Sequence, residues 1–348
     1  MNAEWQTTLG ALGARINDGK VCDFGNPEGE LTAARDATIV APLTHLNLIE
    51  CAGDDAKSFL HNQLTSDVNH LEAANAQYAA WCSPKGRMLT SFVLFRRDAD
   101  YLALLSADLR EFIQKRLQVY VLRSKVKISD RSADYEIIGL SGPQATAALQ
   151  NAGLEAPATA MATTVTTGLA NASVIRLDDK RYIVIVASGS AARTWQQLSA
   201  IATPAGTPVW QWLDIAAGIP WITEATREAF VPQMANFDRI GGISFHKGCY
   251  PGQEVIARIR YLGKIKRHLY RARAASPITA GMPIFSAQVT TQIPDPLCGQ
   301  IANAAAAPGG GCNVLAVILE DATDKGGLHV TSTDGGTIGL TDLDPVSE

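Results

Sequence analysis

Residues 247–254 of the chain read Lys247-Gly248-Cys249-Tyr250-Pro251-Gly252-Gln253-Glu254. A thiol, an amine, a phenol, an amide and a carboxylate stand here among two glycines, which allow other backbone to come close. Val255, Ile256 and Ile259 follow at helical spacing, so the pattern predicts a helix that begins directly after the segment. Free amides at a helix start favour a thiolate over a thiol, and we expect the amine of Lys247 to act in the same direction.

The residue types that surround Cys249 in the sequence favour a functional role over simple packing. Most free cysteines fill small apolar spaces. The alternative interpretation is therefore that Cys249 only packs in such a space and that the glycines around it only turn the chain. Packing, however, does not require an amine, a phenol and a carboxylate around a thiol. Cys249 and Lys247 are therefore the candidate reactive residues. The remaining cysteines stand in apolar or glycine-rich contexts and are interpreted as structural: Cys22, Cys51, Cys82, Cys298 and Cys312.

The composition is that of a globular protein. The chain has 348 residues, 47% of them hydrophobic and 18% charged, with a net charge of -4, so two or three domains are expected. It lacks a basic and then apolar start and an apolar run of roughly 18 residues, so we expect a cytoplasmic protein without membrane contact. No cysteine or histidine pattern has zinc-ligand spacing, and no metal is expected.

Patterns on both sides of the cysteine segment predict a mixed α+β fold. Residues 76–83 and 88–96 are predicted to be strands joined by the turn Pro84-Lys85-Gly86-Arg87. The strand at 264–273, followed by glycine, proline and asparagine turns, opens a predicted C-terminal β-barrel. Residues 158–172 lack periodicity and are interpreted as a surface connection. Further strands are predicted at 125–129, 135–140, 173–177 and 181–187, and helices at 109–120 and 210–217.

The cysteine segment also resembles a known signature. K-G-C-Y-x-G-Q-E, followed by Arg258, is similar to the motif of the YgfZ family, the folate-binding relatives of the glycine-cleavage T-protein (aminomethyltransferase, GcvT). Residues 60–68 (LHNQLTSDV) and 78–89 (YAAWCSPKGRML) resemble two other family motifs. Three shorter family motifs appear in family order at 217–220, 230–233 and 241–245.

The resemblance implies a three-domain α+β ring with a central channel that holds tetrahydrofolate or a derivative. The expected domains are a folate-binding α+β region at 1–130 and 206–262, a second α+β domain at 131–205, and a C-terminal small β-barrel at 263–348. It further implies an accessory protein for the assembly or repair of iron-sulfur enzymes, including tRNA-modifying ones, which would be transient partners. The expected folate contacts are Lys247, Gly248, Cys249, Tyr250, Gly252, Gln253, Glu254 and Arg258.

Two cations at the hairpin tip are further candidates. Lys85 and Arg87 suit the anionic glutamate tail of a folate, and an ordinary solvated turn is the equal alternative. A basic band is the basis of a third hypothesis, tRNA binding. Alternation within residues 264–273 makes a strand with one solvated face the competing interpretation. The band holds seven cations and no acid: Arg258, Arg260, Lys264, Lys266, Arg267, Arg271 and Arg273.

Departures from the T-protein bear on whether the chain is an enzyme. Thr90 and Ser91 stand where the T-protein has an aspartate pair, and hydroxyls cannot hold a negative charge beside a developing iminium. Ala216 replaces a glutamate that relatives often carry, with Glu224 as a candidate substitute. Aminomethyl transfer is therefore disfavoured. A folate-dependent one-carbon transferase that uses another base, such as Glu254, stays open as the enzyme alternative.

Overall fold

The computed structural model describes residues 1–168, 171–286, 296–323, 327–331 and 337–346. The chain forms two compact units. Unit 1 comprises Met1–Leu60, Val68–Gln77 and Phe92–Trp210. Unit 2 comprises His61–Asp67, Tyr78–Ser91 and Gln211–Glu348.

A six-stranded sheet forms the centre of unit 1, with the strand order β10-β11-β12-β9-β3-β13. Neighbouring strands are antiparallel except β13, which runs parallel to β3. Most of β12 is an apolar run, Tyr-Ile-Val-Ile-Val, and it is buried on both faces, as such runs are in central strands. The strands are β3 (Ile39–Pro42), β9 (Tyr135–Ser141), β10 (Thr163–Thr166), β11 (Ala172–Arg176), β12 (Arg181–Ala187) and β13 (Thr203–Pro204).

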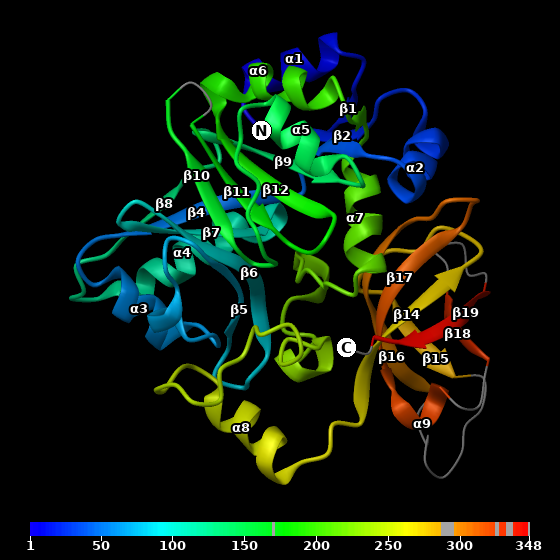
Figure 1. The fold of residues 1–348 in the computed structure, drawn as a ribbon. Coiled ribbons are helices and arrows are strands. Elements are labelled where there is room, and N and C mark those ends of the chain that lie inside the picture. Colours follow the sequence, from blue (N-terminus) through cyan, green and yellow to red (C-terminus); the bar gives the residue numbers. More distant parts are fainter. Residues whose placement is uncertain (169–170, 287–295, 324–326, 332–336, 347–348) are drawn as a thin grey trace. The chain divides into compact units, whose positions relative to one another are not determined.

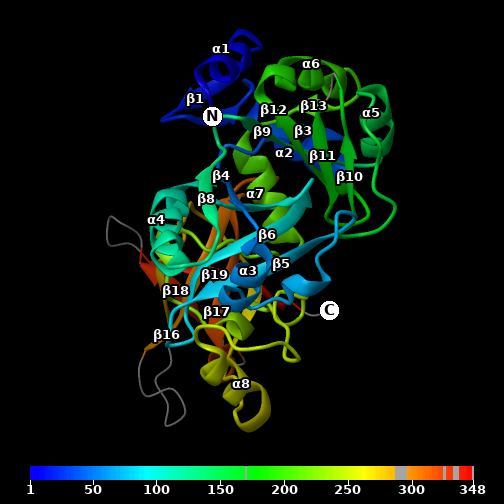
Figure 2. The same ribbon diagram turned by 90° about the vertical axis from the view of Figure 1, so that its left-hand side faces the viewer.

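Three helices cover one face of this sheet: α1 (Ala3–Ala11), α5 (Ala145–Asn151) and α6 (Ser188–Ser199). Figure 2 shows α5 and α6 next to the strands of this sheet. Trp195 of α6 anchors the layer, because its ring contacts Trp5 edge-on at 5.8 Å and stacks on Phe24 at 5.6 Å. The hairpin of β1 (Arg15–Asn17) and β2 (Lys20–Asp23) and helix α2 (Pro27–Asp36) complete the N-terminal part.

A second, five-stranded sheet has the order β5-β6-β7-β4-β8. Its strands are β4 (Leu46–Ala52), β5 (Ala76–Cys82), β6 (Met88–Arg97), β7 (Asp100–Ser106) and β8 (Lys127–Asp130). The predicted hairpin and its turn are thus confirmed as β5 and β6. The helices of this region are α3 (Ala56–Gln63) and α4 (Arg110–Val121), and α7 (Thr207–Ala216) follows β13. The chain passes from one unit to the other within β5, β6, α3 and α7.

Unit 2 contains a closed barrel with the strand order β14-β17-β16-β15-β18-β19 (Figure 1). Alternate residues of β14 (Tyr270, Ala272 and Ala274) belong to the barrel core, as the period of two requires. The predicted C-terminal β-barrel is therefore confirmed. Its strands are β14 (Arg267–Ala274), β15 (Pro283–Ser286), β16 (Leu297–Ala306), β17 (Cys312–Leu319), β18 (Leu328–Thr331) and β19 (Thr337–Pro345), with α9 (Glu320–Thr323) after β17.

The mixed α+β class is also confirmed, and one local prediction was wrong. Residues 158–172 were expected to be a connection, but they contain β10, which pairs with β11 through four residues of each strand. The threonines of β10 carry no periodic apolar signal, and the strand exists because it extends the edge of a sheet assembled elsewhere. The three domain boundaries and the central channel stay predictions. Parts of the range 263–348 lie outside the described residues.

Candidate functional site

The cysteine segment is an irregular loop in unit 2 that ends in α8 (Gln253–Leu262), so the predicted helix is confirmed. Ile256 is fully buried while Val255 and Ile259 are half-buried, which is the apolar stripe that holds a surface helix in place. The Gln253 amide donates to Tyr250 O at 3.1 Å and closes the turn before the helix. The loop is thus tied to a fixed element at its C-terminal end.

The start of α8 packs against the turn between β5 and β6. Gly252 has φ 82° and Gly86 has φ 72°, a backbone conformation that glycine adopts without cost. A β-carbon on Gly252 would lie 2.6 Å from Ser83 O, and one on Gly86 would lie 2.9 Å from Val255 Cβ. The structure thereby brings the predicted cysteine segment and the predicted turn together.

The two turn cations differ in their surroundings. Lys85 is exposed at the tip. Arg87 is half-buried, and its Nη1 donates to the backbone carbonyl of Ala229. The adjacent Met88 amide donates to Phe230 O at 2.9 Å. Arg87 therefore helps to join the hairpin to the 228–230 segment, whereas Lys85 presents its charge to solvent.

Lys247 is held by the segment 61–66. Its ammonium donates to the backbone carbonyls of His61, Leu64 (2.6 Å) and Ser66 (2.9 Å). A lysine ammonium has three N–H donors, so every donor is engaged. These bonds fix the N-terminal end of the cysteine segment onto a loop more than 180 residues earlier in the chain.

The surroundings of this ammonium bear on its expected support of the Cys249 thiolate. The ammonium also lies 5.1 Å from the ring centroid of Tyr250, a cation–π contact. Burial lowers the pKa of Lys247 to about 8, and the charge of Asp67 opposes that fall. Direct support of a thiolate by Lys247 stays a prediction, because in this arrangement its hydrogens point to carbonyl groups.

Cys249 itself is exposed. All six cysteines lie within the described residues, and none of them forms a disulfide; four of the others are buried and Cys22 is half-buried. Burial raises the pKa of Cys51 to about 12 and also raises that of Cys82, which makes both thiols inert. Cys249 is thus the accessible thiol, and it sits in a loop fixed at both ends.

The remaining segment residues divide by exposure. Tyr250 is buried, and burial raises the pKa of its hydroxyl. Gln253 is half-buried at the first position of α8, while Glu254 and Arg258 are exposed on that helix. Glu254 and Arg258 can therefore meet a ligand from solvent, whereas Tyr250 is the residue through which the loop packs against the interior.

Three residues of this region were missed as site candidates. Gln233 is buried and its side-chain amide donates to Ile256 O at 2.7 Å, which fixes α8 from the side. His61 and Asp67 lie in the segment that binds Lys247, with His61 Nδ1 at 3.2 Å from Asp67 Oδ1. The motif resemblance at 60–68 marked this segment, but no spacing rule assigns a side-chain role within it.

The hydroxyls of Thr90 and Ser91, which are expected to stand where the T-protein has aspartates, are part of the core of unit 2. Thr90 and Ser91 are buried. Thr90 Oγ1 donates to Ser91 O at 3.2 Å, and Ser91 Oγ accepts from the Ile222 amide at 3.0 Å. Both hydroxyls are therefore hydrogen-bonded to backbone groups and stabilise the fold.

The carboxylate suggested as a substitute at Glu224 is already paired. Glu224 Oε1 accepts from Arg227 Nη2 at 2.7 Å on a surface turn. Ala216, which is expected to replace a glutamate, accepts a hydrogen bond at its carbonyl from Arg271 Nη1 at 2.8 Å. A ligand that used Glu224 would have to compete with Arg227.

The basic band is divided between a helix and the barrel. Its barrel part is engaged: Arg271 pairs with Asp344 of β19, and Arg273 donates to Gly310 O at 2.8 Å. On α8, Arg260 lies 5.1 Å from the ring centroid of Phe245, and that ring contacts exposed Tyr261 at 6.5 Å. Arg258, Lys264 and Lys266 are exposed nearby in the sequence.

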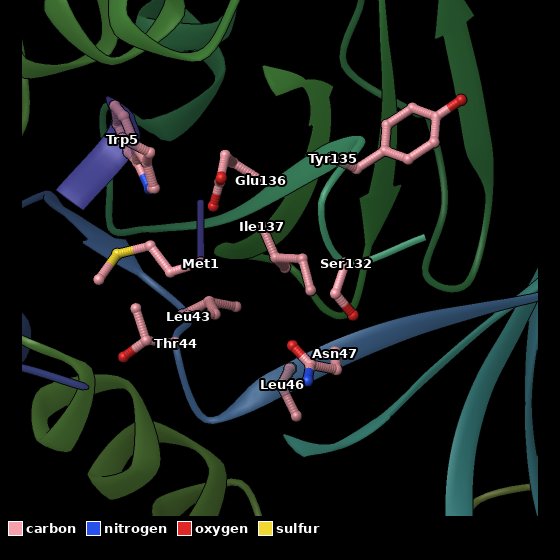
Figure 3. Close-up of a pocket in the computed structure, with 10 residues that line it drawn as sticks. All are labelled: Met1, Trp5, Leu43, Thr44, Leu46, Asn47, Ser132, Tyr135, Glu136 and Ile137. Atoms are coloured by element: carbon pink, nitrogen blue, oxygen red, sulfur yellow. The ribbon is translucent and has the colours of Figure 1, made fainter. Parts of the chain in front are cut away.

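A small cavity lies in unit 1, away from these residues in the sequence (Figure 3). Its volume is about 20 Å³, which is room for one water molecule. Glu136 lines it, and burial raises the pKa of this carboxyl to about 7 even though its Oε1 accepts from the Asn2 amide. A folate does not fit here.

Within the described ranges no three histidine, cysteine or acidic side chains are arranged to hold a metal ion. Among the helices that the structure describes, none has the length and apolarity of a membrane span.

Comparison with known proteins identifies the fold. Residues 23–175 match the family model described as the GCVT N-terminal domain. The solved structure of the glycine cleavage system aminomethyltransferase T from Bartonella henselae aligns with a TM-score of 0.73 at 16% identity, covering 97% of this chain and 94% of that one. The chain therefore has the fold of the GcvT aminomethyltransferase class.

Sequence similarity defines the family more narrowly. The tRNA-modifying protein YgfZ of Enterobacter sp. (strain 638) is 33% identical over 246 residues, which cover 70% of this chain and 74% of that protein. The protein of the same name from Klebsiella pneumoniae (strain 342) is 34% identical over 245 residues, with the same coverage. The chain belongs to the YgfZ family.

Proposed function

We propose that this chain is a folate-binding accessory protein that supports the assembly or repair of iron-sulfur enzymes, including tRNA-modifying ones. The observation that carries the proposal is an exposed thiol, Cys249, in a loop fixed by the Lys247 bonds and by the Gly86–Gly252 contact. The GcvT fold and the name tRNA-modifying protein of the relatives support it. A cytoplasmic location belongs to the same proposal.

The donor set suits one end of a folate better than the other. Lys85 and Arg258 are exposed cations on the two elements that meet at Gly86 and Gly252, and they suit the anionic glutamate tail. For the pterin, Glu254 and Gln253 are candidate acceptors at the start of α8. Bound tetrahydrofolate would supply a one-carbon carrier beside a thiol.

The test is titration of the purified protein with tetrahydrofolate and its 5-formyl and 5-methyl forms. We expect saturable binding that weakens about tenfold in Lys85→Ala, the removed charge being worth about 1.4 kcal/mol. Cys22→Ala, which alters a half-buried thiol, is the matched control for Cys249→Ala. Absence of saturable binding by the wild type would reject the folate part of the proposal.

The role of the thiol is tested in cells that lack the native gene. Cells carrying Cys249→Ala should show low activity of iron-sulfur enzymes, with Cys22→Ala cells at the wild-type level. Normal enzyme activity in Cys249→Ala cells would remove the thiol from the proposal while leaving folate binding intact.

The enzyme alternative is a folate-dependent one-carbon transferase with Glu254 as the base. Its support is the exposure of Glu254 in the first turn of α8, next to the cysteine segment. Turnover of tetrahydrofolate with an amine donor that disappears in Glu254→Gln would favour it. Tight folate binding without turnover would leave the accessory role.

RNA binding is a second candidate function, favoured by the cation and aromatic pair of Arg260 and Phe245 with exposed Tyr261 on α8. In single-stranded RNA sites, aromatic rings typically stack on the bases and cations neutralise the phosphates. We expect tRNA affinity to fall steeply with salt and to weaken in Arg260→Ala, and Arg267→Ala tests the band at the barrel edge. Arg273→Ala, whose guanidinium is engaged with Gly310 O, is the control. Salt-independent binding would reject this candidate.

A further inference from the structure

We propose that His61, oriented by Asp67, accepts the proton of the Cys249 thiol. The inference deepens the proposed function and rests on Cys249 as its reactive group. In the transfer, the S–H bond of Cys249 breaks, its proton bonds to His61 Nε2, and the electron pair stays on sulfur. The products are a thiolate and an imidazolium paired with the Asp67 carboxylate, so charge and atoms balance.

The two ring nitrogens of His61 face different partners. Nδ1 lies 3.2 Å from Asp67 Oδ1. A carboxylate at Nδ1 stabilises a proton there, which leaves the lone pair on Nε2. Nε2 is the atom nearest to the missing side chain of Gly248, at 3.7 Å from the position of a β-carbon. The accepting nitrogen therefore faces the cysteine segment.

Cys249 is the next residue along that segment. Adjacent Cα atoms are about 3.8 Å apart, so Cys249 lies within one residue of the point where the imidazole meets the loop. Gly248 itself places no side chain between the imidazole and the backbone that leads to Cys249. A thiol activated by a histidine that a carboxylate orients is a recurrent arrangement of nucleophilic cysteines.

The anchoring of both segments keeps this geometry fixed. His61 O accepts a bond from Lys247 Nζ, so the backbone that carries the imidazole is bonded to the segment that carries the thiol. The side chains of His61 and Asp67 are largely buried, with 13% and 20% of their surface exposed. The imidazole is thus held in one orientation at the edge of solvent.

The Asp67 carboxylate lies beside the imidazole of His61, and the Lys247 ammonium is bonded to the His61 carbonyl. Asp67 lies on the same chain segment as His61, and its negative charge favours the imidazolium. Lys247 on the cysteine segment opposes it, and its ammonium lies over the ring of Tyr250. Cys249 is the group that exchanges a proton with it.

The test measures alkylation of Cys249 by iodoacetamide from pH 5.5 to 9.5, followed at that residue by mass spectrometry. A thiol without assistance reacts mainly above pH 8. We expect the wild type to react at pH 6.5 on the order of tenfold faster than His61→Gln, with the two rates converging above pH 9. Asp67→Asn should lie between them.

Two controls separate proton acceptance from structural damage. His246→Gln changes an exposed histidine beside Lys247 and should keep the wild-type profile. Cys82, a buried thiol of unit 2, should stay unalkylated in all variants, which reports an intact fold of that unit. If His61→Gln does not fold by this criterion, Asp67→Asn decides the matter through the same pH profile.

Identical profiles of the wild type and His61→Gln would overturn the proposal. A fall by the same factor at every pH would also overturn it, because a lost packing contact and not a lost proton acceptor produces that pattern. The assay contains no folate, RNA or client enzyme, so its outcome is independent of whether the proposed function holds.

Discussion

Gly252 and Gly86 approach each other so closely that a β-carbon on Gly252 would lie 2.7 Å from Gly86 Cα. This contact joins the start of α8 to the β5–β6 turn, two parts of the chain that are about 165 residues apart. It sets how near the exposed charge of Lys85 can come to the cysteine segment.

Gly252→Ala should therefore destabilise unit 2 and displace α8. A left-handed backbone costs a non-glycine residue about 1 kcal/mol, and overpacking adds about 1–3 kcal/mol. Gly309→Ala isolates the first cost, because Gly309 has φ 78° and open space around its β-carbon position. Urea unfolding should show a larger loss for Gly252→Ala; equal losses would mean that the glycine contact contributes nothing.

Replacing Lys247 by methionine should open the segment 61–66. The apolar stem is kept, but three backbone carbonyls lose a charged donor, each bond being worth about 1.5 kcal/mol or more. The reporters are the Thr65 amide, bonded to Ala80 O, and the Ser244 amide, bonded to Thr65 O. Their hydrogen exchange should accelerate at least about tenfold.

Lys85→Met is the matched control for that experiment, since it removes an exposed ammonium of the same kind. Its amide exchange at Thr65 and Ser244 should equal that of the wild type. Unchanged exchange in Lys247→Met would show that the carbonyl bonds do not hold the loop.

The hairpin cations should respond differently to substitution. Arg87→Met removes the bond to Ala229 O and should lower the free energy of unfolding by about 1–3 kcal/mol. Lys85→Met should leave stability within about 0.5 kcal/mol and weaken a polyglutamated folate more than a monoglutamate. Loss of stability in Lys85→Met, or equal weakening of both folates, would contradict this division.

Glu136 should make unit 1 less stable as the pH rises. Burial raises the pKa of its carboxyl from 4.5 to about 7, so the folded state binds the extra proton between these values and stability falls as pH rises through that window. Glu136→Gln should be more stable than the wild type above pH 7, by up to about 3 kcal/mol, and close to it below pH 4.5.

The control for that pH dependence is Glu4→Gln, which alters an exposed carboxyl on α1. Urea midpoints at pH 4.5 and pH 8 provide the comparison. A stability difference between Glu136→Gln and the wild type that is the same at both pH values would show that the carboxyl titrates normally.

Local signals in the sequence predicted much of the scaffold around the site. The turn at 84–87 contains the proline and glycine that its backbone needs, and the helix after Gly252 shows its apolar stripe in Val255, Ile256 and Ile259. The barrel followed from alternation in a single strand and from turn residues. These features depend on neighbours in the sequence, so one sequence suffices to predict them.

The partners of charged side chains could not be predicted, because they depend on how distant segments meet. The Lys247 ammonium binds carbonyl groups, which every residue carries, so no residue type signals that contact. Arg271 belongs to a basic run in the sequence, yet its partner Asp344 comes from the last strand. The same holds for the imidazole of His61, which reaches the cysteine segment only through the folded chain.

The three bonds of Lys247 also have a chemical consequence. An amine nitrogen must meet an acylating reagent directly, and this one is covered by carbonyl oxygens on all three N–H bonds. While the loop is closed, Lys247 is a protected amine, although lysines are ordinarily the first targets of such reagents. Acylation of Lys247 would therefore report the breaking of these bonds, and so the release of the loop that carries Cys249.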